Sequence, residues 1–182
     1  MERKVCVGEE CLYHEYWLTL AAISSIIVLL YSNKGYGYMQ VSVSGPNGGA
    51  VPFDLHIAVG MAAEHFAKQL GIQRLHTTIM IRIHQQALFM GDCEGLCEVV
   101  DERNFVVDVA LWCNWLSTLA HEMVHVKQFA RGELSTDMTQ WKSRRHCGNI
   151  DYENQPWERE ARRLQGRMLE DYTINPGNPT II

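Results

Sequence analysis

The sequence predicts one small domain of the α+β class, in which a small mixed sheet packs against two helices. The chain has 182 residues, of which 47% are hydrophobic and 20% charged, a composition that suits a globular protein with a buried core. From residue 39 onward, short β-branched segments of alternating polarity are mixed with longer segments of helical periodicity. We therefore expect an extension over residues 1–38, a domain over residues 39–174 and a tail over residues 175–182.

The first half of the domain is predicted to contain a strand, a turn and a helix. The alternating segment Met39–Val43 is typical of a short strand, and it runs into the glycine-rich turn Ser44–Gly49. A helix is expected over Leu55–Leu70, with Asp54 as its N-terminal cap and Gly71 just past its end. Its buried stripe should consist of Val59, Ala63, Phe66 and Leu70.

Three strands and a helix are expected next. The β-branched segment Thr77–Ile83 predicts a strand. The segments Leu96–Val100 and Phe105–Val109 flank the polar residues 101–104, a pattern typical of a hairpin. A helix should follow from about Asn114 to Ala130.

A loop and a final helix complete the domain. Gly132 should end the preceding helix, and the loop contains Trp141 and the basic cluster Lys142–His146. With 16 Lys and Arg against 21 Asp and Glu, the formal charge of −5 argues against a nucleic-acid partner, so we interpret the cluster as a solvated loop. The last helix is expected over Pro156–Tyr172, because proline is favoured in the first helical turn.

The extension contains the uncharged apolar segment Tyr16–Tyr31, whose role stays open. It is slightly shorter than the roughly 17–25 residues that a membrane-spanning helix needs. No cleavage site typical of a secretory signal follows it. The segment could be a membrane anchor, a buried or partner-binding helix, or part of a non-native extension upstream of a start at Met39.

The six cysteines form no regular framework. Without a cleavable signal, we expect reduced thiols in a cytoplasmic protein, which would be tethered to a membrane if residues 16–31 are an anchor. The tightest pair, Cys93 and Cys97, lacks the second pair at similar spacing that a structural zinc site would need.

The stretch "LAHEMVHVKQ" carries the chemistry of the chain. On a helix, His121 and His125 project from one face at the spacing that can hold a zinc ion, and Glu122 can reach a water on that ion. A chance HExxH in a chain of this length is rarer than about one in a hundred. The apolar residues on the opposite side are Leu116, Leu119, Met123, Val126 and Ala130.

A catalytic zinc ion needs a third protein ligand. The metzincin pattern would place glycine at position 128 and histidine at position 131, whereas the chain has Gln128 and Arg131. The other common solution is a glutamate on a later helix, and the segment "NQPWEREARR" offers Glu158 and Glu160. We favour Glu158, because the small residue Ala161 lies three positions on and would let two helices approach closely.

The blocks "LAHEMVHVKQFARGEL" and "YENQPWEREA" together resemble small gluzincin-type zinc metallopeptidases of the kind that bacteriophages often encode. The resemblance covers roughly residues 40–172 and implies a minimal zincin-like core with one catalytic Zn²⁺. The residues it implies are the zinc ligands His121, His125 and Glu158 and the general base Glu122.

One position departs from that pattern. Many gluzincins have an acidic residue four positions after the ligand glutamate, where it orients a histidine, but this chain has Arg162 there. Another group must therefore orient the histidines. A donor for the oxyanion is also required, and Tyr152 and His146 are the nearest candidates, although a structural tyrosine and a surface histidine are alternative interpretations.

The predicted function is hydrolysis of peptide bonds in a peptide or protein substrate, through a zinc-bound water activated by Glu122. The strand Phe105–Val109 could recognise the substrate backbone as an added strand. The alternatives are a catalytically silent zinc-binding interaction module, a membrane-anchored interaction protein, and an amidase acting on a cell-wall peptide.

Overall fold

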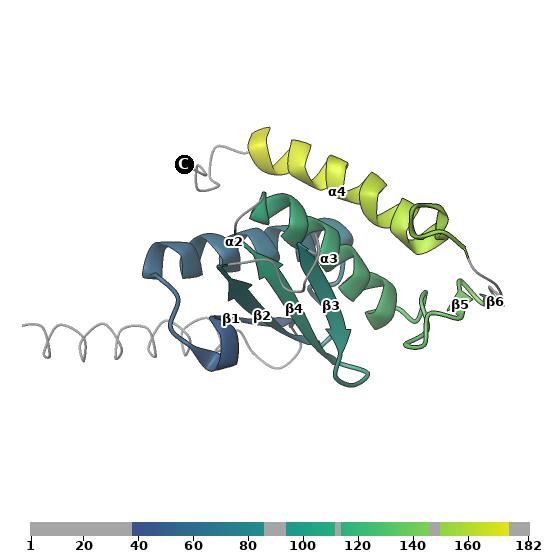
Figure 1. Ribbon diagram of the computed structural model, residues 1–182, viewed down its shortest axis with the longest axis horizontal. Helices are drawn as coiled ribbons and strands as arrows, with labels where there is room; N and C mark the ends of the chain where they lie inside the picture. Colours follow the sequence, from purple (N-terminus) through teal and green to yellow (C-terminus); the bar gives the residue numbers. More distant parts are fainter. Residues whose placement is uncertain (1–37, 86–93, 112–113, 146–149, 175–182) are drawn as a thin grey trace, which may run out of the picture. The chain divides into compact units, whose positions relative to one another are not determined.

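The computed structural model describes residues 38–85, 94–111, 114–145 and 150–174 (Figure 1). These residues form an α+β domain, which confirms the predicted fold class. The elements in chain order are β1 (Gln40–Ser44), the 3₁₀ turn η1 (Pro46–Gly48), α2 (Phe53–Leu70), β2 (Thr78–His84), β3 (Gly95–Val99), β4 (Asn104–Ala110), α3 (Trp115–Ala130), β5 (Gln140–Trp141), β6 (Arg144–Arg145), η2 (Tyr152–Asn154) and α4 (Pro156–Ile174).

The main sheet has four strands in the order β1-β2-β4-β3. The first three are parallel, and β3 pairs antiparallel with β4 at the edge of the sheet. The predicted hairpin around residues 101–104 is therefore confirmed. A separate two-stranded ribbon, β5–β6, lies in the connection between α3 and α4.

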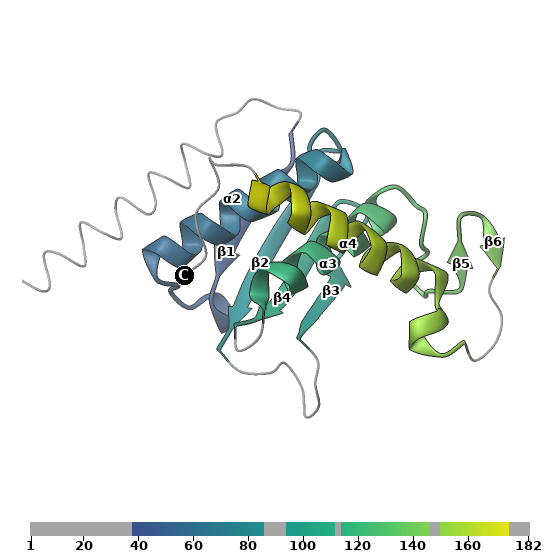
Figure 2. The ribbon, with the colours of Figure 1, turned by 90° about the horizontal axis from the view of Figure 1, so that it is seen from above.

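The helices pack on one face of the sheet, with α4 against α3 (Figures 1 and 2). Alternate residues of the central strands point into this layer, and Ile79, Ile81 and Val107 are fully buried there. The other face of the sheet carries exposed or polar side chains such as Met80 and Arg82. The core thus lies between sheet and helices, on the side of the candidate site.

Helix α2 differs from its prediction at the N-terminus. It begins at Phe53, two residues earlier than expected, after Pro52 in an extended conformation. No side chain caps it, so the prediction that Asp54 is the cap was wrong, and this carboxylate lies in the first turn instead. Its end was predicted correctly, because Gly71 adopts the left-handed conformation with φ 67°.

Helix α3 matches its prediction closely. The side chain of Asn114 accepts a hydrogen bond of 3.3 Å from the backbone N–H of Ser117 and caps the helix. Gly132, with φ 63°, lies just past its end. Of the predicted apolar residues, Leu116, Leu119, Met123 and Val126 are buried in the core and Ala130 is half-buried at its margin.

Strand β4 is an interior strand, so the prediction that Phe105–Val109 could accept a peptide as an added strand was wrong. Its residues pair with β2 on one side and with β3 on the other. The hairpin with β3 leaves one edge of β4 open, and β2, which is distant in the sequence, pairs with that edge. Strand β3 lies at the edge of the sheet and packs against α3.

The connection between α3 and α4 is anchored by a small second core. Trp141 is buried there with Leu134 and Trp157. The basic side chains of Arg144 and Arg145 on β6 are exposed, as expected of a solvated loop. Helix α4 begins at Pro156 as predicted and ends two residues later than expected, at Ile174.

Several predicted features lie outside the described residues. They are the apolar segment 16–31, the tail 175–182, His146, and all cysteines except Cys97, which is buried. Among the helices of the described ranges, none has the length and hydropathy that crossing a bilayer requires.

Shortening a core side chain of α3 should destabilise the domain strongly. Leu119 is completely buried, so Leu119→Ala is expected to lower the free energy of unfolding by about 2–5 kcal/mol. Urea unfolding of the full chain, followed by circular dichroism, measures the effect. Val100→Ala, at a site that is 60% exposed, should change it by less than about 0.5 kcal/mol. Equal losses in both variants would contradict the described core.

Candidate metal centre

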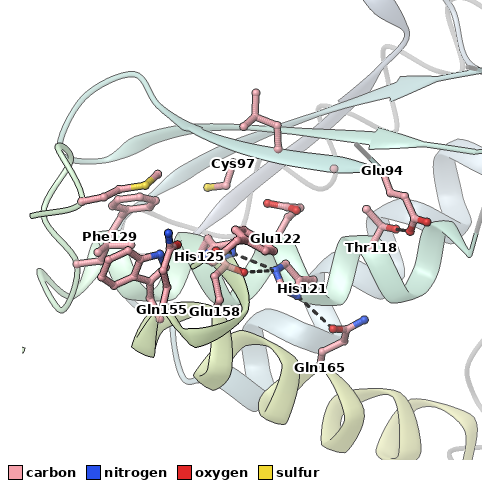
Figure 3. Close-up of a pocket in the computed structure, with 16 residues that line it drawn as sticks. Glu94, Cys97, Thr118, His121, Glu122, His125, Phe129, Gln155, Glu158 and Gln165 are labelled. Atoms are coloured by element: carbon pink, nitrogen blue, oxygen red, sulfur yellow. Dashed lines mark hydrogen bonds and ion pairs between the residues drawn. The ribbon is translucent and has the colours of Figure 1, made fainter. Parts of the chain in front are cut away.

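Three side chains from two helices converge at the surface of α3 that faces α4. His121 and His125 lie one turn apart on α3, and Glu158 lies in the first turn of α4. The two histidine Nε2 atoms are 3.2 Å apart. Glu158 places Oε2 at 3.1 Å from His121 Nε2 and Oε1 at 3.3 Å from His125 Nε2. The three side chains are mostly buried, and together they could hold a metal ion (Figure 3).

Close helix packing brings these groups together. Ala161, three residues after Glu158, is fully buried between the helices. Its small side chain allows the close approach that the sequence predicted. Trp157, the residue before Glu158, packs into the second core and fixes the first turn of α4. The glutamate is therefore held between two packed neighbours.

Two glutamines orient the two histidines. His125 Nδ1 lies 2.9 Å from Gln128 Oε1, and His121 Nδ1 lies 3.1 Å from Gln165 Oε1. Gln128 is completely buried, and its amide nitrogen donates to the carbonyl oxygen of Trp157 at 3.0 Å. The amide nitrogen of Gln165 donates to Ser117 Oγ at 2.6 Å. In both glutamines the oxygen is therefore the atom left to accept a hydrogen bond from the imidazole.

This arrangement sets the protonation of the imidazoles. Each Nδ1 carries the hydrogen that it donates to its glutamine, so in the neutral ring each Nε2 presents a lone pair. The Nε2 atoms of His121 and His125 and the carboxylate of Glu158 are then three acceptors in contact, with no hydrogen between them. Such a cluster is stabilised by positive charge at its centre, which a metal ion or a proton on one imidazole can supply. Burial opposes a positive charge on His125, but Glu158 and Glu122 outweigh it and raise the pKa of this imidazole.

Glu122 is buried beside the cluster but is not one of the three converging groups. Burial raises the pKa of its carboxyl group, and the two histidines only partly oppose that shift. Strand β3 passes very close to it. A Cβ atom at Gly95 would lie 2.7 Å from Glu122 Oε1 and 2.5 Å from Thr118 Cγ2. Glycine at this position is therefore what allows β3 to run against the carboxylate.

Glu158 carries the negative charge of the cluster. Burial alone would raise the pKa of its carboxyl group, but the contacts with the imidazoles of His121 and His125 outweigh burial and hold this pKa well below its ordinary value. Tyr152 also hydrogen-bonds to Glu158. Burial and this hydrogen bond raise the pKa of the Tyr152 phenol well above its usual range. Of the two predicted oxyanion donors, Tyr152 thus lies at the site, whereas His146 is outside the described residues.

Glu160 points away from the cluster. Its carboxylate accepts hydrogen bonds from Lys127 at 3.0 Å, Lys142 at 2.9 Å and Gln128 at 3.2 Å. Although burial alone would raise the pKa of Glu160, these partners lower it to about 2. Of the two glutamates considered from the sequence, the structure therefore brings only Glu158 to the histidines.

The structure identifies the groups that replace the acidic partner expected at position 162. The guanidinium of Arg162 bonds to the backbone carbonyl of Glu153 and lies 5.8 Å from the ring centroid of Tyr152. The histidines are oriented instead by Gln128 and Gln165, which the sequence analysis missed. Gln128 follows His125 by three positions, a spacing that puts both on one helical face.

A cleft of about 720 Å³ contains the cluster. Its walls are β3, α3, the start of α4 and the loop after α3 (Figure 3). Gly95, Leu96 and Cys97 of β3 form one side, opposite the three converging groups. The cluster is therefore open to a molecule that lies along the edge of the sheet.

Comparisons with known proteins do not assign the chain to a family. No protein-family model matches the sequence, and neither curated proteins nor solved structures give a match. The resemblance to gluzincin-type peptidases therefore stays a prediction, and the site has to be judged on its own geometry.

Removing a histidine-orienting glutamine should weaken metal binding without removing a ligand. Gln128→Leu and Gln165→Leu are each expected to raise the dissociation constant for Zn²⁺ about 10–100-fold, because the imidazole loses the acceptor that fixes its tautomer. Competition with a chromophoric chelator measures this constant.

Gln69→Leu is the matched control for this experiment. Gln69 also contacts a histidine, with its Nε2 at 2.8 Å from His65 Nε2, but on α2, away from the cleft. Its affinity for Zn²⁺ should equal that of the parent. An unchanged affinity in both Gln128→Leu and Gln165→Leu would contradict the orienting role.

Proposed function

We propose that this protein is a zinc-dependent metallopeptidase of the gluzincin type. The observation that carries the proposal is the convergence of two imidazole lone pairs and one carboxylate, in a cleft that also holds Glu122. Two histidines and one glutamate are a known ligand set of catalytic zinc, in which a further position stays open. A purely structural zinc site usually has four protein ligands and no use for a neighbouring base.

The spacing of the donor atoms fits zinc. Donors about 2.0 Å from a tetrahedral metal ion lie about 3.3 Å from one another. In the cluster the two Nε2 atoms are 3.2 Å apart, and they lie 3.1 Å and 3.3 Å from different oxygens of the Glu158 carboxylate. One ligand atom from each residue lies within 4.8 Å of the other two, which is close to the spacing around a zinc ion. The ligand set also fits, because imidazole nitrogen suits zinc better than it suits magnesium or calcium. Bound there, the ion would supply Lewis acidity that acidifies water and polarises a carbonyl group.

Glu122 would act as the general base and then as the proton donor to the leaving amine. Its carboxylate lies beside the ligands in the lining of the cleft and is mostly shielded from solvent. The raised pKa of its carboxyl group suits a residue that accepts and returns a proton. Gly95 leaves the space in which this side chain lies.

Strand β3 would hold the substrate backbone. Glu94 accepts a hydrogen bond of 2.8 Å from Ala110 on β4, and in an antiparallel ladder the residues that bond to the neighbour alternate. Leu96 and Glu98 therefore bond to β4, whereas the backbone N–H and C=O of Cys97 point away from it, towards the cleft. An extended peptide could add to this edge as a further strand.

The first test is the metal content of the full chain. The parent, reconstituted with Zn²⁺ and freed of excess metal, should hold about one ion per chain. Glu158→Gln should lose most of it, because one of the three ligands is gone, and Glu122→Gln should keep the metal but lose all peptidase activity. Plasma emission spectrometry and a fluorogenic peptide library supply the two measurements.

Glu160→Gln is the matched variant, since it makes the same change two residues away. It should keep about one zinc ion, because Glu160 bonds to Lys127 and Lys142 rather than to the histidines. Loss of zinc in Glu160→Gln and not in Glu158→Gln would contradict the ligand assignment. A folded parent that takes up no zinc would overturn the proposal, and a parent that holds zinc without cleaving any peptide would favour a silent binding module.

Replacing Tyr152 should separate catalysis from metal binding. The phenol lies in the cleft and hydrogen-bonds to Glu158, from where it could donate to the oxyanion of the reacting carbonyl. Tyr152→Phe is therefore expected to lower kcat about 100-fold while the zinc content stays the same. Steady-state kinetics with parallel metal analysis checks this, and an unchanged kcat would show that the tyrosine is structural.

A further inference from the structure

The two ends of the cleft differ in chemistry (Figure 3). One end begins a turn after His125 and is lined by the apolar residues Phe129, Leu134, Met138 and Trp157. Met138 is 48% exposed there, so the apolar surface reaches the mouth of the cleft. The other end begins a turn before His121, where Thr118 donates a hydrogen bond of 3.3 Å to the carboxylate of Glu94. A carboxylate thus lies at one end, and aromatic and aliphatic surface at the other.

The direction of β3 relates these ends to the direction of a bound peptide. Helix α3 follows β4 closely in sequence and runs back along the sheet, opposite to β4. Strand β3 is also antiparallel to β4, so α3 and β3 run in the same direction. Side chains agree with this. Gly95 lies against Thr118, near the start of α3. Cys97, two residues later, is close enough to Glu122 for the carboxylate charge to affect the pKa of its thiol. The acidic end therefore lies at the start of β3 and the apolar end lies towards its finish.

A peptide that adds to β3 should run antiparallel to it. Antiparallel pairing is the more stable arrangement, and it lets Cys97 exchange both its N–H and its C=O with one residue of the peptide. The N-terminal half of such a peptide would lie over Phe129 and Met138, and its C-terminal half would lie beside Glu94. The peptide bond that lies over His121, His125 and Glu158, at the junction of the two halves, would be the one that is cleaved.

We infer that the cleft selects extended peptides with a large apolar residue just before the scissile bond and a lysine or arginine just after it. This inference rests on the proposed peptidase function. Glu94 supplies the charge for the basic side chain, and its carboxylate lies within hydrogen-bond distance of the Thr118 hydroxyl, which also contacts the carbonyl oxygen of Asn114. Phe129, Leu134 and Trp157 bury the apolar side chain.

Two decapeptides of identical composition test the inference, because they differ only in the central pair, Phe–Lys or Lys–Phe. The zinc-loaded full chain should cleave the first between Phe and Lys with a kcat/KM at least about 10-fold above that for the second. Mass spectrometry locates the cut. In Glu94→Gln the ratio of the two values should fall by about 10-fold.

Glu98→Gln is the matched control, since it removes the same charge from β3, four residues after Glu94. Its side chain is 58% exposed and lies 3.6 Å from Arg82, on the face of the sheet away from the cleft. The Glu98→Gln variant should keep the parental ratio. An equal fall in both variants would overturn the role of Glu94, because it would reflect the overall charge of the strand.

Binding to zinc-loaded Glu122→Gln gives a second readout that does not depend on cleavage. Fluorescence anisotropy should give a dissociation constant for the Phe–Lys peptide about 10-fold below that for Lys–Phe. If the parent cleaves neither peptide while this binding preference holds, the peptidase function fails and the inferred recognition stands. Cleavage or binding that favours Lys–Phe, or that ignores the order, would overturn the inference and leave the peptidase function intact.

Discussion

The site depends on one constraint, which is that three hydrogen-bond acceptors meet in a mostly buried place with no hydrogen among them. Two glutamines impose it, since each accepts the hydrogen of an imidazole Nδ1 and so turns the lone pair of Nε2 towards Glu158. Without a cation the three groups would repel one another. Three features serve this convergence. They are the packing of α4 on α3, the first turn of α4 that positions Glu158, and the hydrogen bonds of Gln128 to Trp157 and Glu160.

Three residues near the start of α4 have separate roles in the surrounding network. Trp157 anchors the turn in the second core and accepts a hydrogen bond from Gln128 through its carbonyl oxygen. Glu158 faces the histidines, and Glu160 neutralises the nearly buried Lys127. Because Gln128 contacts both Trp157 and Glu160, the helix that supplies the third ligand is tied directly to the residue that orients the second.

The converging residues could be predicted because helical spacing is a local property. His121 and His125 share a face by their separation alone, and the proline-started helix with Glu158 was readable from its own residues. The apolar stripe of α3 followed from the same periodicity. Strand order could not be read in this way, because the pairing of β2 with β4 joins segments 26 residues apart, and it turned the expected edge strand into an interior one. The histidine partners were missed because Gln165 reaches His121 only through the packing of two helices.

In the proposed metallopeptidase, the placement of the ligands on two separate helices would tie the lifetime of the protein to the supply of metal. A metal ion that binds only the folded chain stabilises it by about 4 kcal/mol when its free concentration is 1,000 times the dissociation constant. In this domain that stabilisation acts across the junction of α3 and α4, where the last helix would otherwise be held by Ala161, Met168 and Tyr172. When zinc is scarce, α4 should be the first element to detach and be cut by proteases. A cell that limits zinc would then remove the proposed enzyme as well as inactivate it.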